Sequence, residues 1–469
     1  MAEPQQTFDL TVIGSGPGGY VAAIRAAQLG LKTALVEKYP ALGGTCLHIG
    51  CIPTKALLHS AEVLETARTA ARFGVKTSGV TLDLAGVHKH KSDVIRRQAK
   101  GVEFLMKKNG ITVVQGVGRL KGPKQVEVSG GAGGAQTIAT RNILLATGSV
   151  PKMLPDLKVD GTRVITSNEA LGLEFVPKSL IILGAGAVGV EFASIYSRFG
   201  SSVTMVEMLP RVLPLEDEEV SAEMQKAFRK RGIEIRVGTK VESVKVGAKG
   251  VEVQVRSEKG GAETLKAEML LVAVGRRPLT DGLGLEGTKV ELDRGYVKVD
   301  ARMRTGDPSI YAIGDLIPTP AYAHTASHEG IVAAEAIAGR EPEPIDYDQI
   351  PNCTFSDPEV ASIGLTEAIA KARGHKVRIG RFPLPVLGKG RILDLQEGFV
   401  KLVGDERYDE LLGIHIIGGH ATDLIGEGAT ALRLEATVED LFHAIHPHPT
   451  LSEGIGEAAM ALHARGIHL

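Results

Sequence analysis

The chain has 469 residues, of which 43% are hydrophobic, and its 54 basic and 55 acidic residues give a formal charge of -1. This length predicts several domains, whereas the balanced charge and the absence of tryptophan argue against a nucleic-acid-binding surface. Three cysteines are too few for a secreted disulfide framework, and no apolar run reaches the ~20 residues of a membrane span. The N-terminal sequence MAEPQQTFDL lacks a signal-peptide pattern, so we expect a cytoplasmic protein with no metal, nucleic-acid or membrane partner.

The first predicted elements are a strand, a tight turn and a helix. An apolar strand at 8–13 leads into a G-x-G-x-x-G sequence, which a helical pattern follows. Glycines at these positions make the turn and let a pyrophosphate approach the backbone, and an acid after the next strand accepts ribose hydroxyls. This segment therefore predicts a dinucleotide site whose residues are Gly14, Gly16, Gly19 and Glu37.

The sequence GGTCLHIGCIPTK at 43–55 places two of the three cysteines, Cys46 and Cys51, five positions apart. In a regular helix their Cα atoms would be roughly 8 to 9 Å apart, whereas a disulfide tolerates only about 4.4 to 6.8 Å. The backbone between them must therefore be distorted, which Gly50 and Pro53 allow. A helix N-terminus would also acidify a thiol. The segment predicts a redox-active disulfide, and two unrelated buried cysteines are the alternative.

The same pattern occurs a second time. A strand at 180–183 leads into a second G-x-G-x-x-G sequence and a helix, and an acid again follows the third glycine by the same distance. Both copies then contain a helix that ends in a glycine (KNGI at 108–111, KRGI at 230–233), a hairpin-like pair of strands with Gly-rich turns (SGGAGG, SEKGG) and a closing strand. The repeat predicts two tandem dinucleotide-binding domains. The binding residues of the second are Gly184, Gly186, Gly189 and Glu207.

The two sites need not hold the same dinucleotide. The cysteines follow the first copy directly, and a flavin exchanges electrons with both a dithiol and a nicotinamide, so we expect FAD in the first site. The second site then takes the nicotinamide. Glu207 would repel the 2'-phosphate of NADP and therefore favours NAD, although Arg211 is evidence in the other direction because an arginine accommodates that phosphate.

With these residues in hand, the chain resembles the dihydrolipoamide dehydrogenases, a family of FAD-dependent pyridine nucleotide-disulfide oxidoreductases, along essentially its whole length. The matching segments are GGTCLHIGCIPTK, GVEFAS at 189–194, YAIGD at 311–315, the Ala-His step at 323–324 and HPTLSE at 448–453. The resemblance implies that Cys46 exchanges with lipoamide, that Cys51 faces the flavin, and that Lys55 beside the flavin pairs with Glu191. The YAIGD segment taken alone could be an ordinary strand and turn.

The resemblance also assigns the remaining site residues. His448 is implied as the catalytic base and Glu453 as the carboxylate that orients it, and a base suits a substrate thiol whose pKa lies above neutrality. His446 stays open between a structural role and support of His448. The further residues implied at the FAD site, with Gly275 at the NAD site, are Thr45, Lys55, Thr147, Gly148, Asp315 and Ala323.

The expected fold class is α/β, with two tandem Rossmann-like dinucleotide-binding domains and a C-terminal α+β dimerisation domain. The expected domains are FAD-binding with the redox disulfide (1–150), NAD-binding (151–280), a central domain completing the FAD site (281–349) and the dimerisation domain (350–469). Three departures from the family's pattern stand out: His48, Thr54 and His328. None removes a catalytic group, but His48 makes the electrostatics of the thiols uncertain.

The expected function is oxidation of protein-bound dihydrolipoamide to lipoamide with reduction of NAD+ to NADH. The expected assembly is a homodimer that works with lipoyl-bearing proteins of 2-oxo acid dehydrogenase or glycine cleavage complexes. The alternatives are a glutathione- or mercuric-reductase-like enzyme and, from another class, a non-catalytic docking subunit. Cys353 lies far from the other two cysteines in the sequence and is expected to take no part in the reaction.

Overall fold

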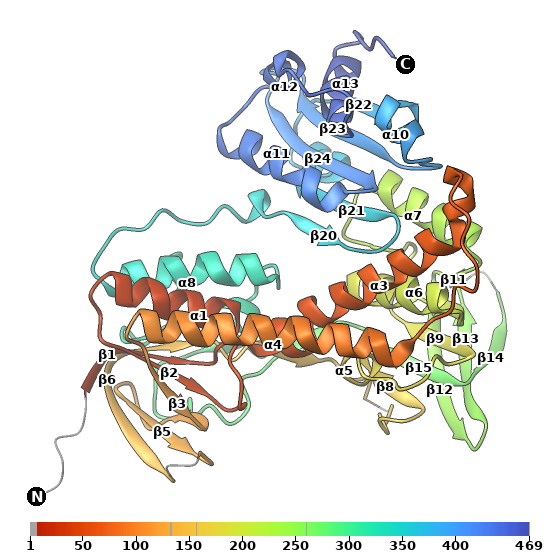
Figure 1. Cartoon of the computed structure of the whole chain (residues 1–469). Helices are drawn as coiled ribbons and strands as arrows, with labels where there is room; N and C mark the ends of the chain where they lie inside the picture. Colours follow the sequence, from red (N-terminus) through yellow and green to blue (C-terminus); the bar gives the residue numbers. More distant parts are fainter. Residues whose placement is uncertain (1–6, 132–133, 156, 259, 469) are drawn as a thin grey trace, which may run out of the picture. The chain divides into compact units, whose positions relative to one another are not determined.

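The structure is a computed structural model that describes residues 7–131, 134–155, 157–258 and 260–468. It divides into two compact units, each assembled from segments that are far apart in the sequence (Figure 1). The first unit consists of Met1–Ala56, Ala85–Lys152 and Arg276–Tyr347, and the second consists of Leu57–Leu84, Met153–Gly275 and Asp348–Leu469. The first unit therefore combines the first G-x-G-x-x-G turn, the two cysteines of the 43–55 segment and the YAIGD segment.

A mostly parallel sheet forms the centre of the first unit. Its strand order is β3-β2-β1-β6-β5-β4, and β19 pairs with β6. The central strand β1 pairs in parallel with both neighbours, so that Val12 lies opposite Leu35 on one side and Leu144 on the other. The strands are β1 (Thr7–Ile13), β2 (Thr33–Glu37), β3 (Thr112–Gln115), β4 (Val117–Leu120), β5 (Gln125–Ser129), β6 (Gln136–Leu145) and β19 (Ile310–Ala312).

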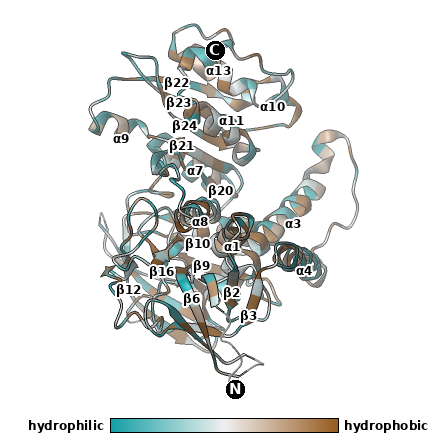
Figure 2. Cartoon of the chain, turned by 90° about the vertical axis from the view of Figure 1, so that its left-hand side faces the viewer, coloured by the Kyte–Doolittle hydropathy of each residue, from teal (hydrophilic) through white to brown (hydrophobic). Residues whose placement is uncertain are grey.

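Helices α1 (Pro17–Gln28) and α8 (Ala323–Ile337) of the first unit pack so closely that their backbones are in contact. A Cβ atom on Gly18 would lie 2.8 Å from the Ala326 carbonyl oxygen, and one on Gly330 would lie 2.6 Å from the Gly18 oxygen. Only glycine permits this approach. Figure 2 shows helix α4 (Leu84–Lys108) next to α1, and α4 is the more hydrophilic of the two. The other elements here are α2 (Gly44–Ile49), β7 (Ser149–Pro151), β16 (Arg276–Pro278), β17 (Leu292–Asp293), β18 (Tyr296–Val297), η2 (Gly314–Leu316) and η3 (Tyr347–Gln349).

The second unit contains a sheet that repeats the arrangement of the first, with strand order β11-β10-β9-β15-β8. Its central strand β9 pairs in parallel with β10 and β15, which places Ile182 opposite Met205 and Leu271. The strands are β8 (Val164–Thr166), β9 (Ser179–Leu183), β10 (Ser202–Val206), β11 (Glu234–Arg236) and β15 (Met269–Val272). The helices are α5 (Ser167–Ala170), α6 (Ala187–Phe199) and α7 (Glu218–Lys230); α3 (Cys51–Thr69) runs from the first unit into the second and is followed by η1 (Ala70–Phe73).

The predicted repeat is confirmed at the helix ends. Helices α4 and α7 are followed by Gly110 and Gly232, whose φ angles of 66° and 76° are left-handed, and a strand begins two residues later. The predicted hairpin-like pair of strands is confirmed in each copy, and a further antiparallel strand precedes each pair. The three strands are β4, β5 and the start of β6 in the first copy, and β12 (Thr239–Gly247), β13 (Gly250–Ser257) and β14 (Ala262–Ala267) in the second. The strands β4 and β12 were not predicted. Parts of both Gly-rich turns, at 132–133 and 259, lie outside the described residues.

The rest of the second unit is an antiparallel sheet with strand order β20-β21-β24-β23-β22. The segments FVKLVGD and LLGIHIIG form β23 (Phe399–Asp405) and β24 (Leu411–Gly418), and both are buried along their whole length. The other strands are β20 (Asn352–Thr354), β21 (Glu359–Gly364) and β22 (Val377–Pro383). The helices are α9 (Glu367–Ala372), η4 (Leu384–Val386), α10 (Gly388–Ile392), α11 (Ala421–Arg433), α12 (Val438–His443) and α13 (Glu453–Leu462).

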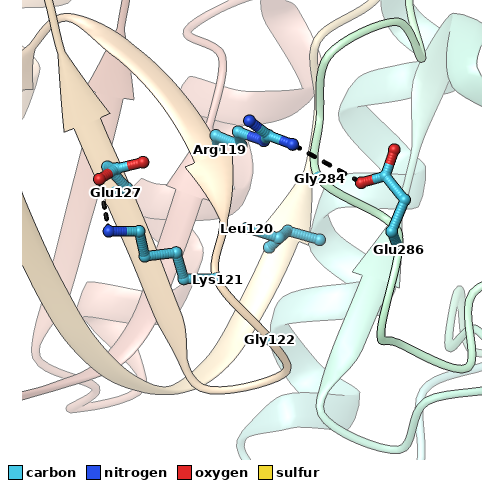
Figure 3. Close-up of a pocket in the computed structure, with 7 residues that line it drawn as sticks. All are labelled: Arg119, Leu120, Lys121, Gly122, Glu127, Gly284 and Glu286. Atoms are coloured by element: carbon cyan, nitrogen blue, oxygen red, sulfur yellow. Dashed lines mark ion pairs between the residues drawn. The ribbon is translucent and has the colours of Figure 1, made fainter.

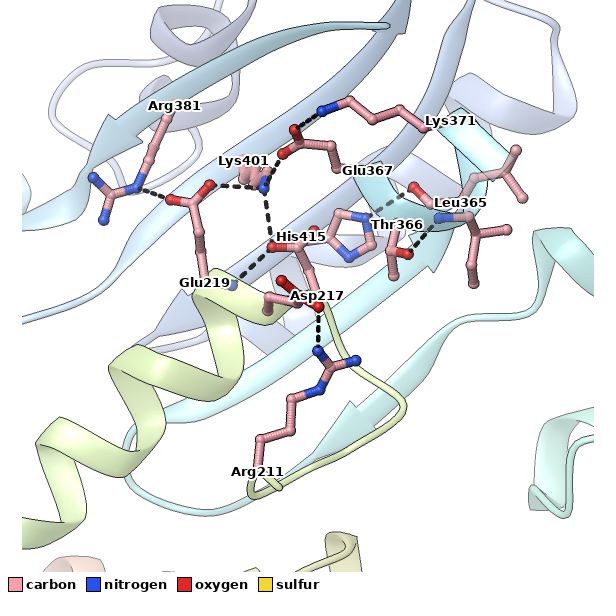
Figure 4. Close-up of polar contacts among 12 residues, drawn as sticks. Arg211, Asp217, Glu219, Leu365, Thr366, Glu367, Lys371, Arg381, Lys401 and His415 are labelled. Carbon is pink, nitrogen blue, oxygen red and sulfur yellow. Dashed lines mark hydrogen bonds and ion pairs between the residues drawn. The ribbon is translucent and has the colours of Figure 1, made fainter. Parts of the chain in front are cut away.

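A buried lysine joins three elements of the second unit (Figure 4). The side chain of Lys401, on β23, is only 2% exposed, and its ammonium group contacts Asp217 (3.0 Å), Glu219 (2.7 Å) and Glu367 (2.8 Å). We call these four residues the Lys401 cluster. Burial alone would lower the pKa of Lys401, but the three carboxylates raise it above its ordinary value. Because the carboxylates come from the start of α7 and from α9, the cluster fastens both helices to β23.

Neighbouring residues balance the charge of the Lys401 cluster. Arg381 contacts Glu219 (3.2 Å) and Lys371 contacts Glu367 (2.6 Å), so the three carboxylates face three cations. The buried ring of His415 bonds through Nε2 to a backbone carbonyl (3.0 Å), and burial lowers the pKa of this ring. The imidazole is therefore neutral near pH 7 and adds no charge.

Among the described residues, we find no helix with both the length and the apolar character needed to cross a bilayer.

The Lys401 cluster generates a stability prediction. Lys401→Met should lower the free energy of unfolding by about 3–5 kcal/mol, because removing one partner leaves buried carboxylates uncompensated. Urea unfolding followed by circular dichroism, at a fixed protein concentration, measures this loss. The control is Lys371→Met, whose side chain is 58% exposed and whose loss should stay within about 1 kcal/mol. Equal losses in the two variants would contradict the role assigned to the cluster.

Candidate active site

The two G-x-G-x-x-G turns have the same geometry. A Cβ atom on the first glycine of each, Gly14 or Gly184, would lie 2.3 Å from the backbone oxygen of the residue that follows a neighbouring strand. A Cβ atom on the third, Gly19 or Gly189, would lie 1.9 or 2.0 Å from the oxygen of the first. The second glycines, Gly16 and Gly186, face open space and precede helices whose N-termini have no side-chain cap. Both turns thus fit a pyrophosphate, which needs open space and free amides at a helix N-terminus.

The two acids that follow these turns are also held alike. Glu37 accepts hydrogen bonds from the amides of Ser15 (2.9 Å) and Tyr39 (2.8 Å). Glu207 accepts them from the amides of Ala185 (2.7 Å) and Leu209 (2.8 Å). Each carboxylate is therefore tied to the residue between the first two glycines. This contact places it next to the turn, where a bound dinucleotide presents its ribose hydroxyls.

The segment that carries the cysteines packs directly on the first turn. A Cβ atom on Gly44 would lie 2.6 Å from the Cα atom of Gly16, so no larger residue fits at this position. The amide of Gly43 donates to the Ser15 hydroxyl (3.0 Å), and that hydroxyl donates to Glu37 (2.7 Å). One serine therefore links the acid, the turn and the cysteine segment. Ser15 was not among the predicted site residues, because its hydroxyl gains its partners only through the fold.

The distortion predicted between the cysteines is confirmed. Helix α2 ends at Ile49, Gly50 adopts φ -143° and ψ -116°, and α3 begins at Cys51. A Cβ atom on Gly50 would lie 2.9 Å from the Thr45 carbonyl oxygen and 3.2 Å from the Cα atom of Cys46. Thr54, noted as a departure, donates its hydroxyl proton to the Gly50 carbonyl (2.6 Å) and supports this bend.

The structure brings the two thiols within hydrogen-bonding reach of each other. Hydrogen bonding to Cys51, followed by burial, raises the pKa of Cys46, whereas the charge of Lys55 acts to lower it. The ring of His48 bonds to the Leu42 carbonyl (2.8 Å), a contact with the backbone. Burial raises the pKa of Tyr20, and the charge of Cys46 adds to this effect.

Asp315 lies in the same unit and is held by two residues. Ser149 donates its hydroxyl proton to the Asp315 carboxylate. Arg276 in turn donates to the hydroxyl (2.7 Å) and the carbonyl (2.7 Å) of Ser149. Burial lowers the pKa of Arg276, while Asp315 and Cys51 both raise it, so the guanidinium lies within electrostatic reach of the second thiol. The sequence analysis did not select Ser149 or Arg276.

A buried acid that sequence reasoning missed shapes the turn before Asp315. Glu329 on α8 is fully buried and accepts from the Gly314 amide (2.6 Å), the Thr319 hydroxyl (2.7 Å) and the Tyr347 hydroxyl (3.0 Å). Burial raises the pKa of Glu329. The sequence offered no distinguishing signal, because α8 carries a second acid, Glu335, which pairs with Arg25.

The remaining residues expected at the dinucleotide sites lie at turns or helix starts. Thr147 donates its hydroxyl proton to the Leu279 carbonyl (2.8 Å). Gly148 and Gly275 have left-handed φ angles of 70° and 105°. Ala323 is the first residue of α8, and Thr45 lies in the first turn of α2. Their roles in cofactor binding stay predictions.

His448 and Glu453 form the expected pair in the second unit. Nδ1 of His448 bonds to Oε1 of Glu453 (2.9 Å), and the Thr450 amide donates to Oε2 (2.8 Å). Burial acts against ionisation of Glu453, but these two partners lower its pKa below the ordinary value. His446 makes a separate pair with Glu427 (2.7 Å), which raises the pKa of the His446 ring. His446 is thus engaged with its own acid.

Glu191 lies in the second unit, where it is buried on α6 and accepts a hydrogen bond from the Phe355 amide (3.0 Å). Lys55 belongs to the first unit, and the ion pair between Lys55 and Glu191 stays a prediction. Within the described ranges, no three His, Cys, Asp or Glu side chains gather in a way that could hold a metal ion.

A separate cavity of about 320 Å³ in the first unit contains no predicted site residue (Figure 3). Its charged side chains pair with one another: Arg119 contacts Glu286 (3.8 Å) and Lys121 contacts Glu127 (2.5 Å). The full lining is Arg119, Leu120, Lys121, Gly122, Glu127, Gly284 and Glu286. With its charges paired, this cavity is not a candidate active site.

Comparison with known proteins decides the family. Residues 8–330 match the model for pyridine nucleotide-disulphide oxidoreductases, and residues 350–459 match the dimerisation domain of the same proteins. The chain belongs to the pyridine nucleotide-disulphide oxidoreductase family. The expected family, fold class, oxidoreductase chemistry and cofactors, FAD and NAD, are thereby confirmed for this family member. Its C-terminal residues carry the family's dimerisation domain.

Members of this family with high similarity include dihydrolipoyl dehydrogenases from several organisms. The chain is 47% identical to that of Bacillus subtilis (strain 168), covering 98% of this chain and 99% of the relative. It is 45% identical to that of Thermus scotoductus, covering 99% of both chains. Among solved structures, LpdA from Mycobacterium tuberculosis has a TM-score of 0.89 at 28% identity, covering 97% of this chain and 99% of the other.

The bend at Gly50 generates a second prediction. Gly50→Ala should push Cys46 and Cys51 apart, because the new methyl group meets backbone atoms at 2.9 and 3.2 Å. We expect the equilibrium between disulfide and dithiol to shift toward the dithiol by about tenfold, or ~30 mV. Equilibration in glutathione buffers, an acid quench and counting of free thiols measure it. Gly101→Ala on α4, where nothing lies within 4 Å, should leave the equilibrium unchanged. An unshifted equilibrium in Gly50→Ala would contradict this account.

Proposed function

We propose that this chain is a dihydrolipoyl dehydrogenase, which oxidises protein-bound dihydrolipoamide to lipoamide and reduces NAD+ to NADH. The observation that carries the proposal is the pair of thiols, Cys46 and Cys51, held by backbone contact against the first dinucleotide turn. Relatives of that name align with the chain over nearly its whole length. No observation favours a glutathione- or mercuric-reductase-like activity or a non-catalytic docking role.

The cofactors would bind at the two G-x-G-x-x-G turns. The turn at 14–19, Glu37 and Asp315 would hold FAD, and the turn at 184–189 and Glu207 would hold NAD. When bound, FAD links the two-electron chemistry of a dithiol to the hydride chemistry of a nicotinamide. The negative charge of Glu207 favours NAD over NADP because the 2'-phosphate would meet a carboxylate.

His448 is the proposed base. Because its Nδ1 is engaged by Glu453, Nε2 is the atom that accepts the substrate's thiol proton, and the carboxylate stabilises the resulting imidazolium. The substrate thiolate attacks the sulfur of Cys46, the bond between Cys46 and Cys51 breaks, and its electron pair leaves on Cys51. The second substrate thiol, deprotonated in turn, displaces Cys46 and closes the ring of lipoamide.

Positive charges near the cysteines support these steps. Lys55 acts to lower the pKa of Cys46, and Arg276 lies within electrostatic reach of Cys51. Both charges stabilise a thiolate and so favour the form that leaves the broken disulfide. We also propose that Lys55 pairs with Glu191, which would hold the lysine in place beside the flavin.

The proposed working unit is a cytoplasmic homodimer. A reactive dithiol needs a reducing compartment, and the dimerisation domain at 350–459 supports pairing of two copies. The proposed domains are FAD-binding (1–150), NAD-binding (151–280), central (281–349) and dimerisation (350–469). The proposed partners are lipoyl-bearing proteins of 2-oxo acid dehydrogenase or glycine cleavage complexes. In this arrangement each disulfide would be served by His448 of the partner subunit.

The nucleophilic role of Cys46 gives a direct test. Cys46→Ser should lower turnover of dihydrolipoamide with NAD+ by roughly a thousandfold or more, because a serine hydroxyl cannot replace the thiolate. The variant should keep its flavin, which absorbance confirms. Cys353→Ser is the matched control and should retain activity within about twofold, since Cys353 lies outside the dithiol segment on β20. Full activity in Cys46→Ser would refute the assignment.

The shared site gives another prediction. Homodimers of Cys46→Ser and of His448→Ala should each be nearly inactive. A heterodimer of the two, purified with separate affinity tags, contains one intact dithiol that faces one intact His448. It should regain up to about half of the wild-type rate, because a two-fold dimer holds two equivalent sites. Recovery of no activity, or isolation of an active monomer, would rule out the shared site.

A further inference from the structure

The loop between β10 and α7 connects two features of the nicotinamide site. It begins at Glu207, carries Arg211 four residues later, and ends at the first turn of α7. An arginine near the acid is the feature that accommodates the 2'-phosphate of NADP. Discrimination against NADP therefore depends on whether the guanidinium of Arg211 is available, as well as on the repulsion from Glu207.

Both terminal nitrogens of the Arg211 guanidinium have partners. Nη1 contacts Oε1 of Glu218 (2.7 Å), and Nη2 donates to the Pro214 carbonyl (3.2 Å). The Arg211 side chain is 33% exposed and that of Glu218 is 73% exposed. The positive charge that would attract a phosphate is thus compensated by a carboxylate from α7. The loop is anchored near its middle by the bond from the Leu213 amide to the Ala185 carbonyl (2.8 Å).

The Lys401 cluster determines where Glu218 lies. The residues on either side of Glu218, Asp217 and Glu219, both contact the buried ammonium of Lys401 (Figure 4). Asp217 also caps α7 by accepting from the Glu219 amide (3.1 Å). Because both of its neighbours are held, Glu218, the first residue of α7, extends its carboxylate toward Arg211. The described ion pairs of Lys401 do not include Glu218. The rigid cluster therefore orients an exposed ion pair.

We propose that Glu218 is a specificity-determining residue for the nicotinamide cofactor, because it keeps Arg211 from accepting the 2'-phosphate of NADP. Glu218 acts through Arg211 and is a positioning residue. Glu207 supplies repulsion at the ribose, and Glu218 removes the attraction that would offset it. The inference deepens the proposed function and rests on the assignment of NAD to this domain.

The size of the effect follows from the exposure of the pair. Exposed ion pairs contribute at most about 1 kcal/mol, so freeing Arg211 should change phosphate binding by roughly three- to fivefold. The neutral variant Glu218→Gln keeps the shape of the side chain. Because Glu218 is mostly exposed, this replacement should leave the fold intact. Glu207 remains in place, so the variant should still prefer NAD.

The test uses the flavin-loaded enzyme and four proteins: wild type, Glu218→Gln, Arg211→Gln and the double variant. Calorimetry measures the binding of adenosine 2',5'-bisphosphate and of 5'-AMP, which differ by the 2'-phosphate. Glu218→Gln should bind the bisphosphate roughly three- to fivefold more tightly and 5'-AMP within about twofold. Its kcat/KM for NADP should rise by the same factor relative to NAD. Arg211→Gln and the double variant should show no gain.

Glu223→Gln is the matched control, because it removes the same charge from α7 at a residue that contacts Lys226. It should leave bisphosphate binding unchanged. Three outcomes would overturn the proposal: no tighter binding in Glu218→Gln, a gain that survives in the double variant, or an equal gain in Glu223→Gln. Absence of dihydrolipoamide oxidation with either nicotinamide would instead refute the proposed function, and the calorimetric comparison would still decide the role of Glu218.

Discussion

The contact between Gly44 and Gly16 is the constraint on which the first unit depends. At this point two backbones approach so closely that a Cβ atom on Gly44 would lie 2.6 Å from the opposing Cα atom. The turn proposed to bind a pyrophosphate is therefore in direct backbone contact with the segment that carries the thiols. Ser15 strengthens the connection by bonding to both Gly43 and Glu37. Together these contacts fix the position of the dithiol segment relative to the turn.

The second unit uses the same turn for a different purpose. Glu207 and Ala185 reproduce the contact between Glu37 and Ser15, but alanine has no hydroxyl to recruit a further segment. The second turn is instead followed by a loop whose end is fastened by the Lys401 cluster. One duplicated architecture thus acquires two functions through what is attached to each turn, a redox segment in one copy and an ion-paired loop in the other.

Much of this could be predicted from the sequence, because the signals were local. The glycine spacing, the bend between Cys46 and Cys51 and the strands at 399–405 and 411–418 follow from patterns within a few residues. The features that escaped prediction depend on long-range partners. Lys401 looks like one polar residue in an apolar strand until Asp217 and Glu219 are placed beside it. Glu329 likewise gains its role from Gly314 and Tyr347.

The division of the first unit among distant segments has a consequence for biosynthesis. Strand β19 completes the sheet by pairing Ile310 with Ile143 on β6. The residues between these two strands must therefore be translated before this edge of the sheet is covered. At 5–20 residues per second, this interval lasts on the order of ten seconds. During that time the apolar edge of β6 is exposed in the nascent chain. Chaperone occupancy should therefore be greatest while residues between β6 and β19 are being translated.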